Sequence, residues 1–136
     1  MNTLLVVLAG VVLALLLAST ANRGIAARAQ RIYAVALIVA ALVYVAFGLL
    51  GNADAHWLLL EGAGVALFGA TALLGLRRWP AVLAAGWIAH VVWDLALHLD
   101  GAGAAYTPSW YPWLCVGFDL ALAATILTRP GPARAT

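Results

Sequence analysis

The sequence predicts an all-α integral membrane protein, a compact bundle of about five transmembrane helices with its N-terminus outside the cytoplasm and its C-terminus inside. Two observations predict the fold. Hydrophobic residues make up 66% of the chain and charged residues only 9%, a balance that a soluble domain with a charged surface does not have. The apolar residues also fall into five stretches of roughly 20 residues, the length that spans a bilayer.

Short breaks rich in Gly, Pro, Asn and Asp separate these stretches and are typical of turns. The chain has 136 residues, which leaves no room for a separate soluble domain. We therefore expect residues 1–128 to form a single bundle and residues 129–136 to form a short cytoplasmic tail. In chain order the expected spans are 3–21, 32–50, 57–76, 81–99 and 111–128.

The distribution of arginines predicts the orientation of the bundle. Every arginine follows the first, third or fifth span, so all of them fall on one side, which the positive-inside rule makes cytoplasmic. This pattern also argues against a nucleic-acid-binding patch, because the arginines neighbour helix ends instead of forming a basic surface. The residues concerned are Arg23, Arg28, Arg31, Arg77, Arg78, Arg129 and Arg134.

The first two spans offer little chemistry. Between Leu4 and Ala18 the first span has no polar side chain, so we expect it to face lipid or a second copy of the chain, which favours a homo-oligomer. The second span contains Tyr44, whose phenol could point into a polar pocket or toward the membrane interface. Cys115 in the fifth span is interpreted as a small buried hydrophobe.

The last three spans contain five ionisable residues that apolar helices would not otherwise include. Each costs about 2.5 to 3.5 kcal/mol to insert, so the set needs a joint explanation. On the third span a row of small residues, Gly62, Ala66 and Ala70, would let another helix approach closely. With the predicted topology all five lie in the outer half of the membrane and predict a polar pocket there, enclosed by the last three spans and open outward: Glu61, His90, Asp94, His98 and Asp119.

The spacing of His90, Asp94 and His98 places all three along one face of an α-helix. A carboxyl group in a low-dielectric pocket favours its neutral form, and a nearby imidazole can share its proton. We therefore expect Glu61, His90, Asp94 and Asp119 to be catalytic in proton-transfer chemistry of the isomerase or cyclase type. The substrate would be a lipid-soluble small molecule bound by Tyr44, Trp87, Trp93, His98 and Phe118, whose rings could stabilise a developing cation.

Three alternatives remain open. Zn, Fe or Mn could be bound by a subset of His90, Asp94, His98, Glu61 and Asp119, and the metal would then assist the chemistry. A proton- or cation-coupled transporter also uses intramembrane acids and histidines, although no such residues occupy the inner halves of these spans. Finally, the polar residues could be satisfied pairs that only hold the helices together.

Overall fold

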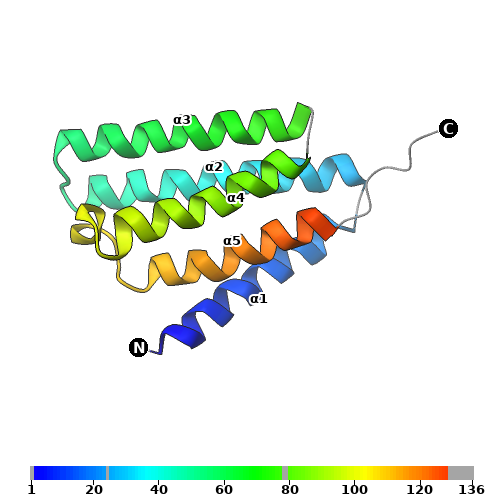
Figure 1. Cartoon of the computed structure of the whole chain (residues 1–136), viewed down its shortest axis with the longest axis horizontal. Helices are drawn as coiled ribbons and strands as arrows, with labels where there is room; N and C mark the ends of the chain where they lie inside the picture. The colour runs from blue at the N-terminus through cyan, green and yellow to red at the C-terminus, as the bar shows by residue number, and fades with distance from the viewer. Residues whose placement is uncertain (1, 24, 78–79, 129–136) are drawn as a thin grey trace.

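The computed structural model describes residues 2–23, 25–77 and 80–128, and this part of the chain is helical without a strand (Figure 1). Five of its helices are long and apolar enough to cross a membrane, as the sequence predicted. The five long helices are α1 (Thr3–Ala21), α2 (Ala26–Leu50), α3 (Ala55–Arg77), α4 (Pro80–Trp93) with its π-helical continuation η1 (Asp94–Leu99), and α5 (Tyr111–Thr128). A short 3-10 helix, η2 (Ala102–Ala105), lies between η1 and α5.

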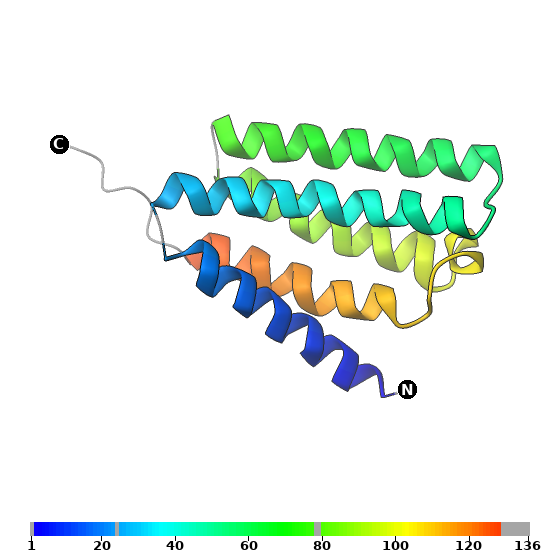
Figure 2. The same ribbon diagram turned by 180° about the vertical axis from the view of Figure 1, so that it is seen from behind.

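The helices do not pack in chain order. α5 lies between α1 and α4, α4 also packs on α3, and α3 packs on α2. Although α1 and α2 are neighbours in the chain, they make little contact, and α1 diverges from the rest of the bundle toward its N-terminus (Figures 1 and 2). α1 is therefore held almost entirely by α5.

Glycine makes the contact between α1 and α5 possible. A side chain added at Gly10 would collide with the backbone of Leu114 and Phe118 on α5, and one added at Gly117 would collide with the backbone of Val7 on α1. The two helices thus cross backbone against backbone, a geometry that only glycine permits here.

The described arginines gather at one end of the bundle, as predicted. Arg23, Arg28, Arg31 and Arg77 lie where α1 ends, α2 begins and α3 ends, and we call this the arginine end. Asp54 and Asp100, both exposed, lie at the opposite end, which we call the acidic end. The predictions for Arg78, Arg129, Arg134 and the tail 129–136 fall outside the described residues.

Two local expectations from the sequence differ from the structure. α2 begins at Ala26, before the apolar stretch that starts at Ile32, because Ala, Arg and Gln are good helix formers even where they are polar. The row of Gly62, Ala66 and Ala70 is exposed on α3 and does not contact another helix of the bundle. Gly64 makes the close contact instead, because a side chain there would meet the indole of Trp93 at 2.8 Å.

Candidate functional site

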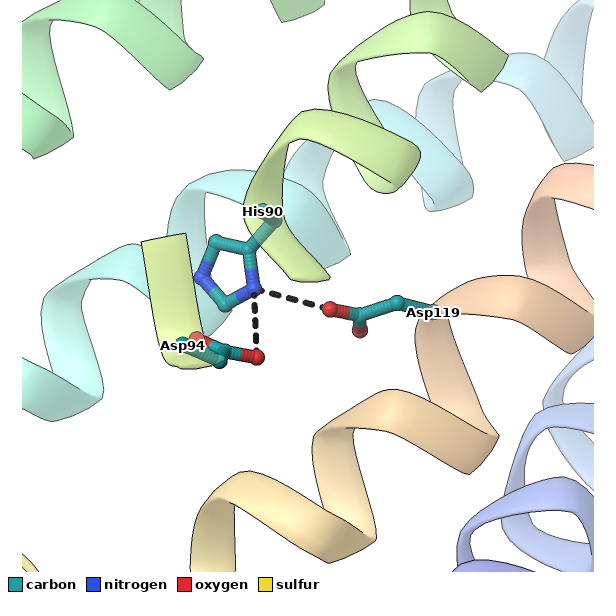
Figure 3. Close-up of side chains that lie close together, drawn as sticks. All are labelled: His90, Asp94 and Asp119. Carbon is teal, nitrogen blue, oxygen red and sulfur yellow. Dashed lines mark hydrogen bonds and ion pairs between the residues drawn. The ribbon is translucent and has the colours of Figure 1, made fainter. Parts of the chain in front are cut away.

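A histidine and two aspartates meet in the middle of the bundle and form what we call the His90 cluster. His90 comes from the last turn of α4, Asp94 from the start of η1 one turn later, and Asp119 from α5. The Nδ1 atom of His90 lies 2.8 Å from Oδ2 of Asp119 and 3.3 Å from Oδ2 of Asp94. Both carboxylates therefore face the same ring nitrogen, while the other nitrogen points away from them (Figure 3).

The cluster is sealed from solvent within the described chain. The side chains of His90, Asp94 and Asp119 are all 0% exposed. Both carboxylate oxygens of Asp94, Oδ1 of Asp119 and Nε2 of His90 have no hydrogen-bond partner among the described residues. Buried polar atoms of this kind normally have hydrogen-bond partners. Here the described residues do not supply them.

Donor atoms from the three side chains lie within 4.8 Å of one another, a grouping that could hold a metal ion. Glu61 and His98, which the sequence analysis also offered as ligands, do not belong to this grouping. At Asp94, α4 continues as the π-helix η1, which contains both Asp94 and His98. Of these two residues only Asp94 contributes to the grouping.

His98 instead reaches α3, where a second set of polar side chains surrounds Glu61. Nε2 of His98 lies 3.3 Å from Oε1 of Glu61, and the Tyr106 hydroxyl donates to the same oxygen at 2.6 Å. The Trp93 indole donates to the other oxygen at 3.5 Å. We call Glu61, Trp93, His98, Tyr106 and Thr107 the Glu61 cluster.

The connection between η1 and α5 supplies two members of the Glu61 cluster that the sequence analysis missed. Oγ1 of Thr107 and Nδ1 of His98 are hydrogen bonded at 3.2 Å, and a side chain at Gly103 would collide with the His98 ring. Burial and the neighbouring Glu61 carboxylate raise the pKa of Tyr106, so its hydroxyl remains a donor at neutral pH. No local sequence signal marks Tyr106 or Thr107, because their roles depend on how the connection folds back.

Tyr44 links the two clusters. Its ring is stacked on that of His98 with centroids 3.7 Å apart, and it is 0% exposed. Its hydroxyl interacts electrostatically with Asp94 but has no hydrogen-bond partner among the described residues. The tyrosine that the sequence analysis left between two interpretations is therefore buried inside the bundle, next to both polar clusters.

Aromatic rings enclose the His90 imidazole. Phe68, which the sequence analysis did not select, lies edge-on to His90 with centroids 4.9 Å apart. The centroid of the Trp87 ring is 6.4 Å from that of His90 and 5.7 Å from that of Phe118. Of the expected substrate-binding residues, Tyr44, Trp87 and Phe118 thus lie around the His90 cluster, whereas Trp93 and His98 belong to the Glu61 cluster.

A cavity of about 230 Å³ reaches the His90 cluster from the side of α1. We expected a pocket enclosed by the last three spans and open at one end of the bundle, but this cavity lies among α1, α2 and α5. Asp119 is its one acidic lining residue. The other lining residues are apolar or weakly polar: Leu13, Ala36, Val39, Ala40, Val43, Tyr111, Leu114, Cys115 and Phe118.

A second hollow, of about 200 Å³, lies at the acidic end. Its walls include Asn52, Asp54, Trp57 and Tyr106, and it is therefore more polar than the first. Tyr106 both lines this hollow and donates to Glu61. The Glu61 cluster thus approaches the acidic end of the bundle, while the His90 cluster faces the apolar cavity.

Fold and site together define a class of protein: an all-helical bundle of five membrane-length helices around a buried His/Asp/Asp cluster that could bind a metal ion. The chain belongs to the family of unknown function DUF6010, whose model matches residues 1–132. No curated protein and no solved structure matches it.

Proposed function

We propose that the protein is a multi-pass membrane enzyme that carries out acid/base chemistry on a lipid-soluble small molecule at the His90 cluster. The bundle would lie with its arginine end in the cytoplasm, which places both polar clusters in the outer half of the bilayer. The observation that carries the proposal is the double position of Asp119. Its carboxyl group belongs to the buried cluster, and the residue is also one of those that line the apolar cavity.

This position suits proton exchange with a bound molecule. Asp119 is the group that a substrate in the cavity would meet, so it acts as the proton donor or acceptor. The hydrogen bond at 2.8 Å lets His90 share or replace that proton. Asp94, close to the same nitrogen at 3.3 Å, supplies a second negative charge that stabilises the imidazolium form.

The lining of the cavity favours a hydrophobic substrate. Binding pockets for small molecules usually measure about 300–1,000 Å³, so a cavity of about 230 Å³ holds only part of a sterol- or terpenoid-sized molecule. The weak contact between α1 and α2 leaves a side through which the remainder can extend into lipid. The aromatic rings of Phe118 and Tyr111 in the wall would stabilise positive charge on the bound portion.

Transport is a weaker interpretation of the same residues. Residues 62–77, 80–89 and 120–128 form the parts of α3, α4 and α5 nearer the arginine end, and they contain no Asp, Glu or His. A path for protons or cations across the bilayer would need polar groups there. Among the described residues of α3, α4 and α5, acidic and histidine side chains confined to one half of the bundle favour a closed site over a conduit.

Deuterium incorporation would test the proposal even while the substrate is unidentified. The purified protein is incubated in D₂O with lipid-soluble extracts from membranes of the expressing cells and with sterol and terpenoid mixtures. Mass spectrometry then compares native protein with Asp119→Asn, and with Asp100→Asn as a control at an exposed aspartate. We expect one compound class to gain deuterium or change structure with native protein and Asp100→Asn, and Asp119→Asn to lower the rate by at least about a hundredfold.

Uptake of a labelled solute into liposomes without any chemical change, dependent on Asp119, would overturn the proposal in favour of transport. Equal conversion by Asp119→Asn and native protein would also overturn it. Retention of the fold in the variant is checked by its thermal unfolding in detergent, because loss of folding would imitate loss of chemistry.

A further inference from the structure

We infer that the His90 cluster binds a divalent transition-metal ion through Nδ1 of His90 and one carboxylate oxygen from each of Asp94 and Asp119. The binding site is argued from the cluster itself, and the role given to the ion below rests on the proposed function. Neither Glu61 nor His98 takes part, since Nε2 of His98 lies 3.3 Å from Oε1 of Glu61 and the grouping of donor atoms contains neither residue.

The spacing of the donor atoms is the first argument. Metal ions such as Zn²⁺ bind nitrogen and oxygen at about 2.0–2.2 Å, which puts neighbouring ligand atoms about 3 Å apart. The two carboxylate oxygens lie 2.8 Å and 3.3 Å from Nδ1 of His90. A single proton on Nδ1 can form a good hydrogen bond with only one of these carboxylates, whereas a metal ion between the three atoms could be coordinated by both.

Charge balance is the second argument. When both carboxyl groups are ionised, the two carboxylates and one imidazole, all 0% exposed, have a net negative charge even with the imidazole protonated. A buried uncompensated charge is costly. A divalent cation balances both carboxylates with His90 neutral, which is the form of imidazole that binds metals.

The unpaired polar atoms around the cluster are the third argument, and they are independent of its acidic residues. Tyr44 is fully buried, and its hydroxyl, which interacts electrostatically with Asp94, has no hydrogen-bond partner among the described residues. Beside a metal centre this hydroxyl could donate to Asp94 or to a water on the ion, as groups that orient metal ligands do.

The donor set narrows the choice of ion. One imidazole with two carboxylates suits Zn, Fe or Mn, and the imidazole disfavours Ca and Mg, which prefer oxygen ligands. Three protein ligands also leave a position open, as in catalytic zinc sites. Because Asp119 lines the apolar cavity, a water on the ion would face the substrate and replace the Asp119 carboxyl as the acid/base group.

The test is elemental analysis of protein that has been purified in detergent without a chelator or a polyhistidine tag. Native protein is compared with His90→Gln and Asp94→Asn, and with His56→Gln and Asp100→Asn as matched controls at exposed positions. We expect about one Zn, Fe or Mn ion per chain in native protein and in both controls, and a loss of more than about tenfold in the two cluster variants.

Unfolded variants would also lose metal, so the native chain is tested by a second measurement. Its thermal unfolding midpoint is followed after treatment with a chelator and again after addition of Zn²⁺, Mn²⁺ or Fe²⁺. A fall on chelation and recovery with one of these ions is expected, because an ion that binds only the folded state stabilises it. Full metal content in His90→Gln, or absence of metal together with an unchanged midpoint, would overturn the inference.

The outcome is separable from that of the proposed function. Absence of metal together with deuterium incorporation that depends on Asp119 would overturn the metal site and leave the enzyme proposal standing. Stoichiometric metal in a protein that changes no lipid-soluble compound would support the metal site and overturn the proposed enzyme function.

Discussion

At the scale of single residues, the two polar clusters differ in how completely their atoms are paired. Both oxygens of the Glu61 carboxylate receive a hydrogen bond, from Tyr106 and Trp93, and in the described Glu61 cluster only Nε2 of His98, 3.3 Å from Oε1 of Glu61, has no hydrogen-bond partner. In the His90 cluster three carboxylate oxygens have no partner among the described residues. A paired group stabilises a fold, whereas an unpaired buried group has a cost that a ligand can remove. We therefore assign a mainly structural role to the Glu61 cluster and the proposed catalytic role to the His90 cluster.

This assignment predicts that Tyr106→Phe destabilises the protein without altering its metal content. The substitution removes a hydrogen bond to a carboxylate, and we expect a loss of about 1 kcal/mol in unfolding measured in detergent. Glu61→Gln should weaken the same contact, so the double variant should lose less than the sum of the two single losses. Strictly additive losses would show that the two side chains do not cooperate.

At the scale of elements, the π-helix η1 and the crossing of α1 over α5 shape the site. Within η1, Asp94 joins the His90 cluster while His98 approaches Glu61, so the predicted set of residues is divided between two clusters. The crossing, at Gly10 and Gly117, brings α1 against α5 and makes Leu13 a wall of the apolar cavity. Both features arise where helices depart from ideal packing, which is where functional sites are often found.

The glycine crossing predicts that Gly117→Ala is harmful. The added methyl group would collide with the backbone of Val7, so α1 must move away, and we expect a destabilisation of about 1–3 kcal/mol. Thermal unfolding of the variant is compared with that of Gly69→Ala, a helical position where an added methyl meets nothing within 4 Å. Similar midpoints for the two variants would argue against close contact between α1 and α5.

At the scale of the whole molecule, the arginine end and the acidic end give the bundle a clear polarity. The four described arginines are at one end and the exposed Asp54 and Asp100 are at the other. Large apolar side chains, among them Leu8, Leu49, Leu74 and Leu120, are exposed along the outside, as expected for a surface that faces lipid.

The polarity predicts that the C-terminus lies in the cytoplasm. Green fluorescent protein fused after Thr136 should fluoresce, and alkaline phosphatase fused at the same place should be inactive, because each reporter works on only one side of the membrane. A cysteine placed at Asn52 in a Cys115→Ala background should react with a membrane-impermeant reagent in intact cells. The reverse pattern would invert the bundle and place both clusters near the cytoplasm.

Sequence reasoning found the helices because long apolar stretches need no tertiary information. It also selected His90, Asp94 and Asp119, since ionisable residues stand out in an apolar helix. It placed His98 with them on helical spacing alone, whereas the His98 ring stacks on Tyr44 and approaches Glu61, contacts that depend on how the helices pack. Leu13 and Phe68 could not be selected, because an apolar residue becomes part of a site only through the packing around it.

The way α1 is attached has a consequence for specificity. Because α1 rests on α5 and makes little contact with α2, the width of the apolar cavity depends on how closely two backbones approach at Gly10 and Gly117. Under the proposed function, changes at these glycines would widen the aperture and admit bulkier molecules without replacing a residue of the His90 cluster. Members of one family could in this way share a reaction and differ in the width of the molecule that they bind.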